Sequence, residues 1–189
     1  MKKIAFLAAA ACAAIAAPAM AQSSATGTIT LNGTVANKCS VTSAPAGSTF
    51  AQTVNFGELA QANGTLRSGL AGEFTTAAVQ ATVVCNTGTP KVAVDANPMV
   101  NVTTAAPTGY ANTINYTASV AVTATGANAG PFTNSTLAAA APATAVGSAL
   151  ANSANNVVIT TNTYATPAAT DILVAGSYTG TIVVVISPA

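Results

Sequence analysis

Few side chains in this sequence are able to do acid–base or nucleophilic chemistry. Histidine is absent, and 189 residues carry only five basic and four acidic side chains. The carboxylates are scattered rather than paired, at Glu58, Glu73, Asp95 and Asp171. Without histidine there is no Ser–His or Cys–His pair for nucleophilic catalysis and no imidazole ligand for a metal. The composition argues against an enzyme, and no catalytic, metal-binding or cofactor-binding residue is predicted.

The cysteines are the remaining reactive side chains, and their fate depends on the start of the chain. Lys2 and Lys3 precede an apolar run, Ile4–Ala17, and then Ala19-Met20-Ala21, a typical signal-peptide cleavage site. The run, about 14 residues, is short for a membrane-spanning helix, which needs about 20. We therefore expect residues 1–21 to be a cleaved signal peptide that directs export to the periplasm.

Cleavage of this signal removes Cys12 and leaves Cys39 and Cys85. An even pair in an oxidising compartment predicts one disulfide. It would close a loop worth about 4 kcal/mol in the chain-entropy model. Two free buried thiols are the alternative. A lipoprotein signal at Cys12 is the other alternative, although no Leu stands three residues before that cysteine.

The charge that remains after export is small. Residues 22–189 carry three basic and four acidic side chains, a formal charge of −1. Charged residues make up 5% of the chain, against roughly 25% in an average soluble domain. No basic stripe is present to neutralise phosphates, so nucleic acid is not expected as a partner. No small-molecule substrate is expected either.

The elements that must position any site are predicted to be strands. In residues 22–37, Ile29, Leu31 and Val35 share one phase of a period-two pattern, which indicates a half-buried strand. Further strands are predicted at Cys39–Thr42, Thr53–Phe56, Val79–Cys85, Lys91–Asp95, Thr113–Thr123, Asn155–Tyr164 and Tyr178–Ser187. Loops are predicted through Pro45 and Gly47, at Gln61–Gly72, at Asn86–Pro90 and, in preference to a short helix, at Leu137–Ala154. The pattern indicates one all-β sandwich domain.

Both ends of the exported chain carry motifs that occur together in one family. Ala25–Cys39 combines an alternating apolar stretch, a glycine in phase with it and the first cysteine. Phe56-Gly57 follows a short predicted strand, and the second cysteine ends Val79–Cys85. In this order the motifs resemble the subunits of chaperone–usher pili. Ala175–Ile186 resembles the closing strand of the archaic branch, whose subunits share the spore coat U domain.

This resemblance implies an incomplete immunoglobulin-like β-sandwich of about six to eight strands, residues 38–189, with an N-terminal donor-strand extension, residues 22–37. The last strand of such a domain borders an open groove. A periplasmic chaperone fills the groove first, and the extension of the next identical or homologous subunit then replaces it at the outer-membrane usher. The implied product is an extracellular fimbria on a bacterial surface, used in adhesion or biofilm formation.

The resemblance also assigns roles to residues of this chain. The donor strand would offer Gly27, Ile29, Leu31, Gly33 and Val35 to the groove. Gly33 would fit where the groove is too shallow for a side chain, whereas Gly27 departs from the apolar residue that is commoner at the first position. The groove edge would be formed by Tyr178, Ile182, Val184 and Ile186. Val183 and Val185 make the other face apolar too, so the pattern leaves open which face borders the groove.

Three alternatives remain at this stage. Residues 22–37 are also compatible with the first strand of a complete sandwich, with Gly33 in a bulge. The same segment is long enough to fold back into its own groove, because residues 36–38 suffice for a hairpin turn. The third alternative is a soluble secreted β-sandwich binding module, carbohydrate-binding or a small adhesin, that does not polymerise. Such a module would be expected to show exposed aromatic rings or a carboxylate cluster for calcium.

Overall fold

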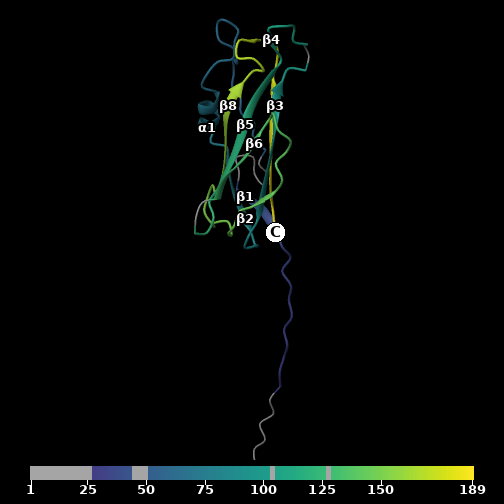
Figure 1. Ribbon diagram of the computed structural model, residues 1–189. Helices are drawn as coiled ribbons and strands as arrows, with labels where there is room; N and C mark the ends of the chain where they lie inside the picture. The colour runs from purple at the N-terminus through teal and green to yellow at the C-terminus, as the bar shows by residue number, and fades with distance from the viewer. Residues whose placement is uncertain (1–26, 44–50, 103–104, 127–128) are drawn as a thin grey trace, which may run out of the picture. The chain divides into compact units, whose positions relative to one another are not determined.

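The computed structural model describes residues 27–43, 51–102, 105–126 and 129–189 (Figure 1). The predicted signal peptide and the predicted loop through Pro45 and Gly47 lie outside these ranges. Val35–Ala189 belong to one compact unit, here called the domain, and Gly27–Thr34 are described separately. No helix within the described ranges is long and apolar enough to cross a membrane.

The domain is all-β apart from one short helix. Its elements are β1 (Cys39–Ser43), α1 (Leu70–Thr76), β2 (Gln80–Cys85), β3 (Lys91–Val100), β4 (Tyr110–Ala111), β5 (Thr113–Val122), β6 (Ala129–Ser135), β7 (Thr144–Ala145), β8 (Val157–Ala165), β9 (Ile172–Leu173) and β10 (Thr179–Ser187). Eight of the strands form one antiparallel sheet in the order β1-β2-β8-β5-β3-β10, with β6 beside β5 and β7 beside β3. The strands β4 and β9 form a separate parallel pair.

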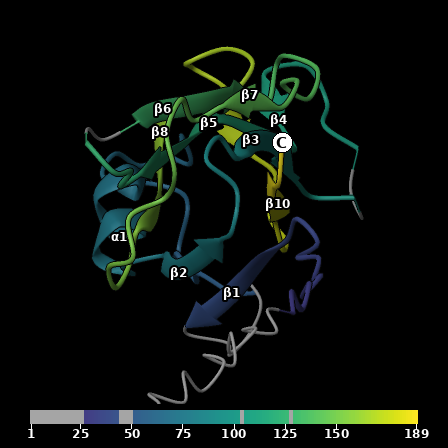
Figure 2. The same ribbon diagram turned by 90° about the horizontal axis from the view of Figure 1, so that it is seen from below.

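The core is built on β5. Its predicted inward phase is confirmed, because Ile114, Tyr116, Ala118, Val120 and Val122 are all buried. On one edge β5 pairs with β8, and on the other it pairs first with β3 and then with β6. Figure 2, which looks along the strands, shows β2, β8, β5, β3 and β10 following one another around this core.

Most of the predicted strands are confirmed, some with shifted ends. β1, β2, β5, β8 and β10 lie where the alternation placed them. The strand predicted at Lys91–Asp95 is longer and runs on through Pro98 to Val100. Pro98 is tolerated there because it has no register partner in either neighbouring strand, at the place where the β10–β3 register shifts. The predicted turn Asn86–Pro90 separates β2 from β3.

Several predictions are wrong. Residues 27–37 form no strand, and their apolar side chains are exposed rather than half-buried. Thr53–Phe56 is not a strand either, since no described segment pairs with it. The predicted loop Gln61–Gly72 contains the start of α1, which forms because Leu70 and Phe74, four residues apart, are both buried. Leu137–Ala154 is free of helix, as predicted, but it is not purely a surface loop, because β7 lies within it and Val146 and Leu150 are buried. The strands β4, β6 and β9 were not predicted.

Asparagine side chains replace missing peptide groups in the sheet. Asn156 is buried, and its side chain accepts from the Val83 N–H over 2.8 Å and donates to the Val83 carbonyl over 2.7 Å. Asn134 likewise accepts from the Ala96 N–H over 2.9 Å and donates to the Ala139 carbonyl over 2.8 Å. These side chains extend strand pairing where backbone contacts end, because a carboxamide carries the same donor and acceptor as a peptide.

Candidate functional site

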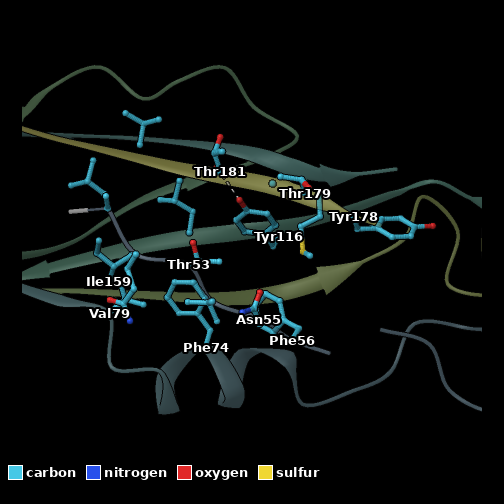
Figure 3. Close-up of a pocket in the computed structure, with 18 of the residues that line it drawn as sticks. Thr53, Asn55, Phe56, Phe74, Val79, Tyr116, Ile159, Tyr178, Thr179 and Thr181 are labelled. Atoms are coloured by element: carbon cyan, nitrogen blue, oxygen red, sulfur yellow. Dashed lines mark hydrogen bonds between the residues drawn. The ribbon is translucent and has the colours of Figure 1, made fainter. Parts of the chain in front are cut away.

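A groove lies between β10 and residues 51–56 (Figure 3). Its volume is about 620 Å³. One side is lined by Tyr178–Val184, at the start of β10, and the opposite side by residues 51–56, here called the wall. The floor is formed by Phe74, Val79, Met99, Tyr116, Ile159 and Tyr164. Apart from the hydroxyls of its tyrosines, this floor is apolar.

The strand β10 borders the groove with an open edge. It pairs with β3 along one edge, and no described strand pairs with the other. Its inner face, Tyr178, Ile182, Val184 and Ile186, packs against the core but is only half-buried. Val183 and Val185 are exposed on the outer face. The structure therefore settles which face points inward, and three of the four predicted edge residues, all but Ile186, line the groove.

The wall behaves as a strand that lacks a partner. Val54 and Phe56 turn partly inward and Thr53 and Asn55 are exposed, so the burial alternates with the period of a strand. Within the described ranges, the backbone groups of Thr53, Val54 and Asn55 make no hydrogen bond. Strand-forming residues are thus present, but no strand in the described ranges pairs with them. The groove offers unpaired peptide groups on both of its sides.

Side chains hold the wall in place of strand pairing. The Arg67 guanidinium donates to the Phe56 carbonyl oxygen over 2.6 Å, to the Glu58 carbonyl oxygen, and to the Glu73 carboxylate of α1. Gln52 donates from its amide to the Ala77 carbonyl oxygen over 3.1 Å. The hydrogen bond from Arg67 lowers the pKa of Glu73 below its ordinary value, and the nearby positive charge acts in the same direction. We call the Arg67–Glu73 pair the latch.

Aromatic rings fill the floor next to the wall. The ring of Phe56 stacks on Phe74 at 6.5 Å and meets Tyr164 edge-on at 5.7 Å, and Tyr116 stacks on Tyr164 at 5.5 Å. The Tyr116 hydroxyl lies 2.8 Å from the Asn97 carbonyl oxygen and 3.0 Å from that of Thr181, the second contact being drawn in Figure 3. Burial raises the pKa of Tyr116, so the phenol stays protonated as a donor to these carbonyls. The rings therefore set the depth of the groove at this point.

A smaller cavity continues the groove beyond Tyr178. It has a volume of about 290 Å³ and is lined by Gly57–Ala60 on one side and Leu173–Gly176 on the other. The Tyr178 hydroxyl lies 2.9 Å from the carbonyl oxygens of both Ala111 and Val174, which fixes the ring at the junction of the two cavities. The seven residues Tyr178–Val184, of which six belong to β10, border the main groove over a length of about 20 Å. The smaller cavity adds to this length.

The predicted donor residues lie in a segment with exposed apolar side chains, Gly27–Val35, here called the tail. Ile29 is 87% exposed, Leu31 90% and Val35 82%. A Cβ added at Gly27 or at Gly33 would meet no atom within 4 Å. Neither glycine is therefore required by packing within the chain.

The predicted disulfide between Cys39 and Cys85 is confirmed. It joins the first residue of β1 to the last residue of β2, which face each other in register. The start of the domain is thereby attached covalently to its sheet, directly after the tail.

Sequence reasoning missed the wall as a groove side, the latch and the aromatic floor. Phe56-Gly57 and the i, i+4 pair Leu70 and Phe74 were the available signals for the wall and for α1. No three His, Cys, Asp or Glu side chains cluster within the described ranges. Comparison of the chain with protein-family models, with curated proteins and with solved structures finds no match.

Proposed function

We propose that this chain is a structural subunit of a bacterial surface fimbria, exported to the periplasm and polymerised by strand donation. In this proposal the domain is an immunoglobulin-like sandwich that lacks one strand. The tail of the next identical or homologous subunit supplies that strand. The observation that carries the proposal is the groove, which is open to backbone pairing along both β10 and the wall.

The tail has the properties that such a groove requires. Its apolar residues alternate with polar ones and are exposed, so they are free to enter a partner. Burial of Ile29, Leu31 and Val35 would contribute roughly 1.5–3 kcal/mol each. Backbone hydrogen bonds would add about 1 kcal/mol apiece. Together these contributions exceed the roughly 8 kcal/mol of a micromolar complex before ordering costs are subtracted.

The length of the tail agrees with the length of the groove. Nine residues in extended conformation, Gly27–Val35, span about 27 Å. This length exceeds that of the segment that borders the main groove. A bound tail would therefore also reach into the smaller cavity beyond Tyr178. The resemblance to pilus subunits implies that Gly33 would lie where the groove is too shallow for a side chain.

An open apolar groove in a secreted subunit also accounts for the proposed chaperone and usher. Unpaired strand edges and exposed core residues promote aggregation until they are covered. A periplasmic chaperone would cover them by lending a strand, and the usher would be the place of exchange. The fibre would then serve adhesion or biofilm formation.

The test is assembly of the exported chain, residues 22–189, followed on SDS gels of unboiled samples. A ladder of species at multiples of the subunit mass is expected, because donated strands dissociate slowly. A synthetic peptide with the sequence of residues 22–37, added in excess, is expected to shorten the ladder by occupying grooves. A protein that stays monomeric at high concentration and binds no peptide would contradict the proposal.

A further inference from the structure

One side chain holds the segment that joins the tail to the domain. This segment, Ala36–Lys38, is here called the tail root. The Asn86 amide donates to the Ala36 carbonyl oxygen over 2.8 Å, and its Oδ1 accepts from the Lys38 N–H over 2.7 Å. The Asn86 N–H also donates to the Lys38 carbonyl oxygen over 3.1 Å. The tail root is therefore paired as though β2 continued by one further peptide group.

The tail root continues the line of β1. Cys39 and Cys85 face each other in register and are joined by the disulfide, and residue 38 pairs with residue 86 in the same register. In addition, the Asn37 side-chain amide lies 3.4 Å from the Ala189 carbonyl oxygen. The tail root is thus held in an extended conformation, next to the residues that follow β10.

A held tail root obstructs insertion of the tail into the groove of its own domain. Such an insertion requires the chain to reverse direction before β1. A reversal needs a turn of at least two residues. Because Ala36–Lys38 are held extended, the turn would have to use Val35 and the residues before it, which are the residues that the groove is proposed to bind.

The position of the tail root also determines whether a tail inserted into the groove of its own domain would run parallel or antiparallel to β10. A tail that turned back would run along β10 from the end of β10 toward Tyr178. Read from Gly27 to Val35, it would therefore be parallel to β10. A second copy has no such constraint and is able to enter antiparallel, which is the slightly more stable pairing per residue.

We propose that Asn86 is a positioning residue that directs the tail to the groove of a second copy by holding the tail root extended. The inference rests on the proposed function and adds the partner and the residue that selects it. Asn156 and Asn134 extend strand pairing by the same carboxamide contacts inside the domain. Asn86 does so at its surface, where the segment that it holds leads into the tail.

The test compares the exported chain with its Asn86→Ala variant, which loses both side-chain hydrogen bonds to the tail root. The probe is a fluorescent peptide with the sequence of residues 22–37, added in excess to dilute protein. Thr89→Ala is the matched control, because Thr89 is exposed in the same turn and makes no side-chain hydrogen bond in the described part of the chain. Asn86→Asp keeps the acceptor for Lys38 and loses only the donor to Ala36.

Asn86→Ala is expected to take up the peptide more slowly, on the order of tenfold, because its own tail then competes for the groove. Asn86→Asp is expected to lie between Asn86→Ala and the unaltered chain, and Thr89→Ala to match the unaltered chain. If Asn86 only supports the fold, Asn86→Ala will unfold more easily and take up peptide as fast as the unaltered chain or faster. That result would overturn the inference alone, whereas no uptake by the unaltered chain would overturn the proposed function as well.

Discussion

Val184 and Val94 face each other across the β10–β3 pair, yet they differ sharply in burial. Val94 is 1% exposed, whereas Val184 on the same inner face stays only half-buried. The difference arises because β3 has neighbours on both edges and β10 has one. Val184 is thus a core residue left half-covered beside the edge of β10 with which no described strand pairs.

Substitutions on the two faces of β10 are expected to act differently. Ile182→Ala removes apolar area that a guest strand would cover, and it should weaken uptake of the tail peptide by about tenfold. Val185→Ala, on the outer face and outside the groove lining, should leave uptake within about twofold of the unaltered chain. Peptide titration by fluorescence anisotropy measures both. Equal losses from the two variants would place the binding surface elsewhere.

Deletion of residues 22–37 is expected to leave a folded subunit that no longer polymerises, because it keeps the groove and lacks the donor. Unboiled SDS gels should show monomer only. Peptide added at a hundred times its dissociation constant should then stabilise the truncated protein by about 2.7 kcal/mol, measured by thermal unfolding. Normal ladders from the truncated protein would show that the tail is not the donor.

The two glycines of the tail provide a matched pair. Gly33→Leu is expected to slow assembly by at least tenfold, because the resemblance implies a groove too shallow for a side chain at this position. Gly27→Leu is expected to assemble at least as fast as the unaltered chain, because it adds apolar area at the first position. Neither substitution meets an atom within the chain, so melting of the monomer should be unchanged. Assembly rates from light scattering decide between these outcomes.

The latch predicts a pH dependence of peptide release. Arg67 lowers the pKa of Glu73 below 4.5, so the contribution of the pair is fully present above pH 4.5 and is lost as the pH falls through the lowered value. Peptide release should therefore accelerate only below about pH 4.5. Glu73→Gln should release peptide faster already at pH 7 and lack the acid step. A stopped-flow series between pH 7 and pH 3 tests the sign.

Loss of the disulfide should destabilise the domain without removing the groove. A Cys39→Ala, Cys85→Ala double variant is expected to lose about 4 kcal/mol of unfolding free energy, since 46 residues separate the two cysteines. Urea unfolding measures the loss. Peptide uptake below the unfolding midpoint should persist, and its complete loss in a folded variant would assign the disulfide a direct part in binding.

The sequence predicted most of the sheet because the strands that are paired on both edges alternate clearly. The inward phase of β5 could be read directly, and so could the pairing of the two cysteines. The inward face of β10 could not be predicted from the sequence, because both of its faces are apolar. Only the surrounding core decides which face turns inward. The tail donor assignment came from a resemblance and stays a prediction.

The wall shows why part of the candidate site could not be predicted from the sequence. Thr53–Phe56 has the residues of a strand, and its side chains alternate in burial, but no strand in the described part of the chain pairs with it. The latch could not be predicted from the sequence for another reason. Arg67 and Glu73 are six residues apart across the start of an unpredicted helix, so nothing in the spacing indicated that they support a groove.

The two open sides of the groove have a mechanical consequence. A guest strand between β10 and the wall would form hydrogen bonds to both, in two rows that run along its length. Tension applied along a fibre would pull the guest lengthwise, so that every bond in both rows carries load together instead of opening one at a time. A link of this kind would resist force far better than its affinity alone would indicate, which would suit the proposed fimbria if it holds a cell in flowing water.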